Sequence, residues 1–194
     1  MSQVINGTSG GDRILGTDAV EVINALQGAD LVIAGGGNDT IKAGSGRDRV
    51  RAGEGDDTVI GGAGGDRLNG DAGSDTLLGG AGEDRLAGGA DNDVLVGGTG
   101  SDTLNGGSGA DVFGFKAEDF STTEKDLIVD FVQGTDKLYI EGFSFSVSKI
   151  TWVGKTAYFD LKGVGSGSYD LAIDFRSQTV FAEGDFTNTL AAIV

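Results

Sequence analysis

An acidic side chain recurs at every ninth residue between residues 7 and 114. Written as rows of nine, this segment has twelve rows without an insertion or deletion, and the sixth place of each row is acidic. Carboxylate oxygens are hard ligands that suit calcium and do not suit soft metals. Glu21 fills the sixth place of row two, and we predict that the aspartates of the other rows bind calcium: Asp12, Asp30, Asp39, Asp48, Asp57, Asp66, Asp75, Asp84, Asp93, Asp102 and Asp111.

The composition excludes most other chemistry. The 194 residues include no His and no Cys, so the usual hydrolytic triads and ordinary zinc sites are ruled out. No HExxH motif is present either, and we predict that the chain is not an enzyme. The formal net charge of -16 should repel nucleic acid and anionic membranes and attract cations. No apolar run is long enough to cross a bilayer, so we expect no membrane insertion.

The eighth place of every row is apolar, from Ile14 to Phe113. One buried residue per row among polar neighbours predicts a very short strand. The Gly-rich first half of each row is typical of a turn, and Gly at the fourth place of ten rows indicates a positive φ there. Two rows then complete one circuit, with odd rows in one sheet and even rows in the other. We therefore predict an all-β, right-handed parallel β-roll over residues 7–114.

Stacking the rows brings like charges together. In a parallel sheet the same place of rows n and n+2 lies ~4.8 Å apart, so Asp48, Asp66 and Asp84 would form a column. Two such charges repel by roughly 3 kcal/mol at an effective dielectric of ~20. The column therefore requires counterions. For any single Asp, a side chain that bonds the backbone of its own turn is the alternative, but eleven in register favour calcium.

The nine-residue pattern GGxGxDxUx resembles the calcium-binding nonapeptide of RTX proteins. The stretches 109–115, 126–131 and 134–143 resemble the segment after the repeats in serralysin-type metalloproteases and in the R-modules of mannuronan C-5-epimerases. The resemblance implies that each ion sits between the turns of rows n and n+2, bound by both Asp side chains and by turn carbonyls. Such carbonyls belong to Gly44, Gly46, Gly53, Gly55, Gly62, Gly64, Gly80 and Gly82.

The number of ions and the course of folding follow from this arrangement. Six turns on each edge leave five gaps, so at most ten calcium ions bind, and Ala19 and Glu21 weaken the gap between rows two and four. Repeats so rich in Gly bury little apolar area against a large loss of entropy. We expect the metal-free chain to be disordered and calcium, which extracellular modules bind with a Kd of roughly 10⁻⁴ to 10⁻³ M, to drive folding outside the cell.

Residues 115–194 have a different composition, with 13 of the 14 aromatic residues and seven of the 37 Gly. Short β-type runs predict a β-rich cap over the last coil. Asp126, Asp130 and Asp136 are either cap residues or a further ion site. The acidic and then apolar end at residues 185–194 resembles that of proteins exported by type I secretion, and the start shows no signal-peptide pattern. We therefore predict a secreted protein of a Gram-negative bacterium.

The seventh place of each row should point outward, and in several odd rows it is Arg. This pattern predicts a ladder of Arg side chains on the outer face of one sheet. Guanidinium groups pair with carboxylates in a bidentate way, which suggests an alginate-like acidic polysaccharide as ligand. The alternative is that these Arg offset the acidic edges or pair with Glu83. Ice binding is disfavoured because Thr does not fill both outward places. The predicted ladder comprises Arg49, Arg67 and Arg85, with Arg47 and Arg51 beside it.

Overall fold

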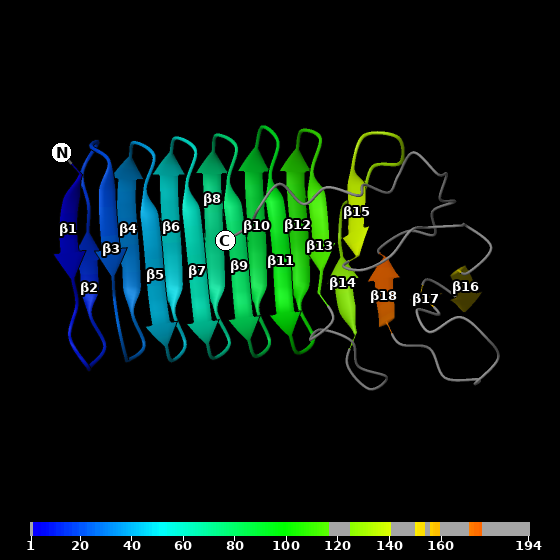
Figure 1. Ribbon diagram of the computed structural model, residues 1–194, viewed down its shortest axis with the longest axis horizontal. Coiled ribbons are helices and arrows are strands. Elements are labelled where there is room, and N and C mark those ends of the chain that lie inside the picture. The colour runs from blue at the N-terminus through cyan, green and yellow to red at the C-terminus, as the bar shows by residue number, and fades with distance from the viewer. Residues whose placement is uncertain (1, 117–124, 141–149, 154–155, 160–170, 176–194) are drawn as a thin grey trace.

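The computed structural model describes residues 2–116, 125–140, 150–153, 156–159 and 171–175. These residues form strands, turns and bends and no helix, which confirms the predicted all-β class. The strands up to residue 140 wind into an elongated parallel coil with a flat, regular outline (Figure 1). The strand at residues 156–159 pairs antiparallel with those at residues 150–153 and 171–175. The predicted secretion signal at residues 185–194 lies outside the described residues, as does much of the predicted cap.

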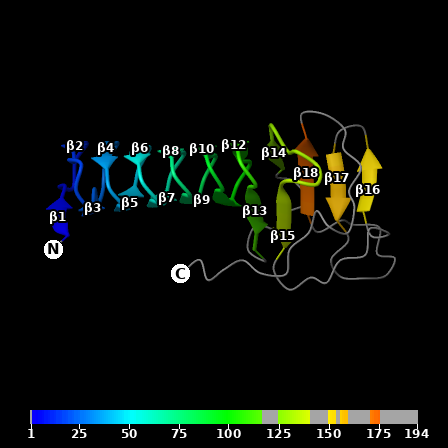
Figure 2. The same ribbon diagram turned by 90° about the horizontal axis from the view of Figure 1, so that it is seen from above.

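Two sheets make up the coil, and they lie as two layers when the molecule is seen from above (Figure 2). The first sheet holds the odd rows, in the order β16 (Ile150–Val153), β17 (Thr156–Phe159), β18 (Leu171–Phe175), β14 (Asp126–Ile128), β12 (Thr103–Ser108), β10 (Arg85–Ala90), β8 (Arg67–Ala72), β6 (Arg49–Glu54), β4 (Leu31–Gly36) and β2 (Arg13–Leu15). The second sheet holds the even rows, in the order β1 (Gln3–Asn6), β3 (Glu21–Asn24), β5 (Thr40–Ser45), β7 (Thr58–Ala63), β9 (Thr76–Ala81), β11 (Val94–Thr99), β13 (Val112–Phe115) and β15 (Lys137–Ile140).

The register between neighbouring strands is one full circuit of the coil. Ile41 pairs with Val59, and Val59 pairs with Leu77, so each eighth place stacks on the eighth place two rows later. The predicted separation of odd and even rows into two sheets is therefore confirmed. β1 adds one strand before row one, because Gln3 pairs with Glu21 and thus occupies a sixth place.

The strands are longer than the sequence pattern predicts. From β4 to β12 each strand runs from the seventh place of one row through the third place of the next, and the turn is confined to places four to six. The prediction of a turn throughout the first half of the row was wrong. Strand alternation explains the difference, because side chains two residues apart point to the same side. The first place therefore points inward as the eighth does.

The core is correspondingly built from two positions in each row. The eighth place supplies Ile23, Ile41 and Leu77, which are fully buried. The first place supplies a second column of small residues, in which Ala34 and Ala43 are also fully buried. Beyond the repeats the core continues through the last two coils with Phe115, Ile128, Leu138 and Ile140.

From row three onward, two places in each row have positive φ rather than one. The fourth place does so as predicted, and Asp91, which replaces Gly there, has φ 75°. The second place was not predicted, yet from row three onward it is positive in every row, including Leu26 at 81° and Asp71 at 76°. Glycine dominates both places because L side chains rarely adopt this conformation.

Candidate metal centre

The sixth-place carboxylates line the two edges of the roll on its inner side. Strand alternation places them on the same side as the buried eighth and first places. From Asp30 to Asp111 each of them is at most 2% exposed, and Glu21 is fully buried. Asp12, in the first coil, is half-buried. The structure thus brings the predicted ligands together as two buried columns, one along each edge.

From Asp30 onward, one oxygen of each carboxylate binds the preceding coil. The backbone N–H of Asp48 donates to Oδ1 of Asp66 at 2.8 Å, and the N–H of Asp66 donates to Oδ1 of Asp84 at 2.7 Å. The same bond repeats along the other edge, where the N–H of Asp57 donates to Asp75 at 2.8 Å. These side chains therefore bond the coil 18 residues earlier, which differs from the alternative of a bond within the same turn.

The other oxygen, Oδ2, is buried without a hydrogen-bond partner along most of each column. A buried carboxylate oxygen without a donor costs the full penalty of removing it from water. Native proteins leave few polar atoms in this state, so a regular series of them points to an ion that the oxygens would bind. The residues concerned are Asp30, Asp39, Asp48, Asp57, Asp66, Asp75, Asp84 and Asp93.

Burial also makes these carboxylates harder to ionise. It raises the pKa of Asp57 and of Asp93 to about 7, with neighbouring carboxylates of the same edge adding to the effect. Burial likewise raises the pKa of Asp66 and of Asp75 to about 6. The N–H bond to Oδ1 opposes the shift but does not cancel it. For the same main reason the pKa lies above its usual value at Asp39, Asp48, Asp84, Asp111 and Asp136.

The glycine backbone packs tightly between successive turns. A Cβ on Gly64 would lie 1.5 Å from the carbonyl oxygen of Gly46, and one on Gly62 would lie 2.0 Å from that of Gly44. The predicted carbonyl ligands at the second and fourth places therefore lie against the following coil. The first place approaches the carboxylate itself, since a Cβ on Gly61 would lie 2.6 Å from Oδ2 of Asp66. Oxygen atoms thus crowd the space beside these glycines.

Both columns continue past the repeats. The N–H of Asp102 donates to Oδ1 of Asp126 at 2.9 Å, and the N–H of Asp111 donates to Oδ1 of Asp136 at 3.1 Å. Asp126 and Asp136 are 3% and 2% exposed, so both occupy sixth-place positions in the coil. The signal was present in the sequence, because each is followed two residues later by the inward apolar residue of a strand, as in the repeats.

These donors fit calcium rather than a metal bound by side chains alone. Within the described ranges, no three acidic side chains converge as a metal cluster. A site here would combine carboxylates with backbone carbonyls. Calcium accepts such sets because it takes six to eight oxygens in flexible geometry, whereas magnesium requires near-ideal octahedral geometry. The residues therefore fit calcium.

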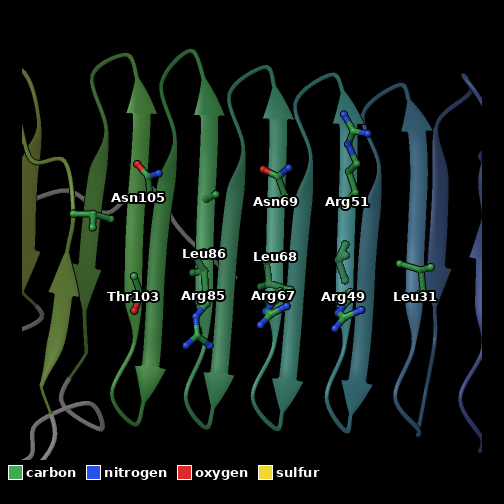
Figure 3. Close-up of a pocket in the computed structure, with 13 residues that line it drawn as sticks. Leu31, Arg49, Arg51, Arg67, Leu68, Asn69, Arg85, Leu86, Thr103 and Asn105 are labelled. Carbon is green, nitrogen blue, oxygen red and sulfur yellow. The ribbon is translucent and has the colours of Figure 1, made fainter.

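The predicted Arg ladder lies on the outer face of the odd-row sheet. Arg49 pairs with Arg67, and Arg67 with Arg85, in register on β6, β8 and β10, and all three are exposed. Figure 3 shows them in line across the strands, with Arg51 and Asn69 in a second line. Arg51 forms an ion pair with Asp71. A groove of about 410 Å³ runs between the two lines over Val50, Leu68, Leu86 and Ala87.

The fold and the stacked acidic corners define a parallel β-roll with metal-binding repeats. The model of the RTX calcium-binding nonapeptide repeat matches residues 6–41, 15–50, 42–77 and 78–113, which is more than half of the chain. The chain therefore belongs to this family, whose repeats bind calcium in general. No match was found among curated proteins.

Two solved structures resemble the chain. The extracellular lipase LipA from Serratia marcescens has 13% identity and a TM-score of 0.38, and the match covers 97% of this chain and 40% of the lipase. A subunit of the Azotobacter vinelandii mannuronan C5-epimerase has 22% identity and a TM-score of 0.43, covering 80% of this chain and 84% of the subunit. The chain thus spans less than half the length of the lipase. Among the residues with assigned structure, no helix has the length and apolar character needed to cross a membrane.

Proposed function

We propose that this chain is a calcium-loaded β-roll whose folding is driven by extracellular calcium after secretion. In this proposal the chain is a non-catalytic module that acts alone or within a larger secreted protein. The observation that carries the proposal is the series of buried Oδ2 atoms without a partner, from Asp30 to Asp93. A coil with these oxygens ionised and unbound is expected to be unstable, and divalent ions would offset that cost.

The concentration of calcium would control where folding happens. Sites that combine Asp oxygens with backbone carbonyls in extracellular modules bind with Kd of roughly 10⁻⁴ to 10⁻³ M. They would stay empty in the cytosol, where the chain could be exported unfolded, and fill outside the cell. Export by type I secretion is the route that the sequence suggests for such a chain.

A calcium titration of the whole chain tests the proposal. With a chelator, we expect a far-UV circular dichroism spectrum of a disordered chain and a large hydrodynamic radius. Millimolar calcium should produce a β-sheet spectrum and a compact particle, because binding supplies the folding free energy. Magnesium at the same concentration is the matched control and should leave the chain largely unfolded. Compact, β-rich protein in the chelator would refute the proposal.

A second candidate function is binding of an acidic polysaccharide in the groove beside the Arg ladder. Arg49, Arg67 and Arg85 present guanidinium groups at the strand spacing, and none of them forms a salt bridge with another described residue. In particular no salt bridge to Glu83 is found there, which was the alternative role. The guanidinium groups would pair with the carboxylates of such a polysaccharide.

Retention on immobilised alginate tests this candidate in the calcium-loaded protein. The double variant Arg67→Ser/Arg85→Ser should elute at much lower salt than the native chain. The control variant Arg13→Ser/Lys42→Ser removes the same charge outside the groove and should elute close to the native position. Equal elution of both variants would show that net charge alone governs retention and would dispose of the groove as a binding site.

A further inference from the structure

The turns of the first two rows differ from all later turns of the repeats. Their second place is Thr8 or Thr17, and neither has a positive φ. Gly10 and Ala19 at the fourth place do not have a positive φ either, whereas from row three onward both places do in every row. The first turn on each edge of the roll therefore has another backbone conformation.

Threonine in these turns takes up the carboxylate oxygens that are orphaned elsewhere. The N–H and the hydroxyl of Thr8 donate to Oδ2 of Asp12 at 2.6 and 2.9 Å. In the next row the N–H of Thr17 donates to Oε2 of Glu21 at 3.2 Å, and its hydroxyl donates to Oε1. Each hydroxyl oxygen also accepts the N–H two residues later, from Gly10 and from Ala19, at 3.2 Å. The same network thus forms twice.

We propose that the first gap on each edge is closed by Thr8 and Thr17 instead of calcium, so that the repeats bind eight calcium ions rather than ten. This inference rests on the proposed calcium-binding function. Six rows on each edge leave five gaps, and removing the first leaves four. The eight orphaned Oδ2 atoms, from Asp30 to Asp93, supply one for each remaining gap.

The direction in which Oδ2 points supports this one-to-one assignment. A Cβ on Gly61 would lie 2.6 Å both from Oδ2 of Asp66 and from the carbonyl oxygen of Gly79 in the following coil. Gly79 repeats the arrangement, with Oδ2 of Asp84 at 2.5 Å and the carbonyl oxygen of Gly97 at 2.4 Å. Each Oδ2 therefore belongs to the gap that follows its own row. In rows one and two this oxygen already has donors.

The consequence is an end coil that is stabilised by the chain itself. Hydrogen bonds to a carboxylate are stronger than those between neutral groups, and Thr8 and Thr17 donate such bonds to Asp12 and Glu21. Rows one and two would form a metal-independent cap on the first calcium-bound coil.

Native mass spectrometry of the full chain, in a calcium titration carried above the expected Kd of roughly 10⁻⁴ to 10⁻³ M, counts the ions. We expect a plateau at eight ions for the native chain and for Asp12→Asn and Glu21→Gln. The matched variant Asp66→Asn, which changes the same group in row seven, should lose one ion. Loss of an ion in Asp12→Asn or Glu21→Gln would show that the first gaps hold calcium and would overturn the inference. Absence of any bound calcium would instead overturn the proposed function.

A second measurement isolates the threonine hydroxyl. Thr8→Val removes the donor to Asp12 with little change of shape, and Thr8→Ser retains it. In calcium, we expect the Val variant to melt several degrees lower and the Ser variant to melt close to the native protein, with eight ions in each. Equal melting temperatures for the two variants would show that the hydroxyl does not stabilise the first turn.

Discussion

Replacing Asp66 with Asn should change stability in opposite directions with and without calcium. The side chain is fully buried in the middle of its column, and the N–H of Asp48 donates to its Oδ1. Asparagine keeps that acceptor and the shape of the side chain. It replaces the orphaned, ionisable Oδ2 with a neutral amide nitrogen. The substitution therefore removes the charge at this corner while keeping the hydrogen bond that joins the coils.

The magnitude without calcium follows from the pKa. Burial raises the pKa of Asp66 from 3.8 to about 6, and at 1.36 kcal/mol per unit the ionised form costs about 3 kcal/mol in the folded state. This cost is present above pH 6 and absent below pH 4. A buried amide without a partner retains a penalty of about 1 to 2 kcal/mol. At pH 8 the metal-free Asn variant should therefore be more stable by about 1 to 2 kcal/mol.

The magnitude with calcium follows from mass action. A site that is filled at 10 to 100 times its Kd stabilises the fold by about 1.4 to 2.7 kcal/mol. Losing the Asp66 oxygen should remove most of that contribution from one site. The calcium-loaded Asn variant should thus be less stable than the native chain by about this amount.

An osmolyte titration and a thermal unfolding experiment measure the change in stability without and with calcium. In chelator at pH 8, a titration with trimethylamine N-oxide folds the chain, because osmolytes favour burial, and the Asn variant should need less of it. In calcium, the Asn variant should unfold at a lower temperature. Glu83→Gln removes the same charge at an exposed position one residue before Asp84 and should change neither result by more than about 0.5 kcal/mol. A loss of stability in both experiments would show that Asp66 acts as a structural residue, and the counterion argument would fail.

Three further outcomes are expected. Because the pKa of Asp57 and of Asp93 is about 7 and calcium must displace their protons, apparent calcium affinity at these sites should fall about tenfold from pH 8 to pH 6, as isothermal titration calorimetry would show. Gly64→Ala places a Cβ 1.5 Å from a carbonyl oxygen of the preceding coil and should abolish folding. Gly134→Ala is the control, because no atom lies within 4 Å of the added Cβ, and it should cost about 1 kcal/mol of stability in denaturant unfolding. Leu77→Ala empties a fully buried core position and should destabilise the calcium-loaded protein by about 2 to 5 kcal/mol in the same assay.

The period of nine carries most of the information about the fold. Each row has an apolar residue at its eighth place and an acid at its sixth place, so the rows must stack in register. The pairing of Arg49 with Arg67 and of Thr58 with Thr76 has that register. Single-residue propensity would not have predicted it, since the rows are rich in Gly, which weakens strands. Repetition therefore outweighed composition in predicting the two sheets.

The same composition concealed the length of the strands. Gly and Ala at the first place are typical of a turn, but here they lie in strands, because a larger side chain would meet the carboxylate of its own row. At Gly70, for example, a Cβ would lie 2.1 Å from Oδ2 of Asp75. Small residues at this place thus reflect the space that the acidic corner needs. One sequence alone does not separate that requirement from a preference for turns.

At the ends of the acidic columns, donors from the chain itself bind the carboxylate oxygens. At the start, Thr8 and Thr17 supply donors to the first carboxylates. After the repeats, the N–H of Val132 donates to Oδ2 of Asp136 at 2.7 Å, so the last carboxylate of that edge also has a donor from its own chain. A column of buried acids needs a partner for every oxygen, and at these end positions the chain itself provides one. The orphaned oxygens between them are consequently the positions where stability is expected to depend on calcium, and variants there should respond to chelators whereas variants at Asp12 should not.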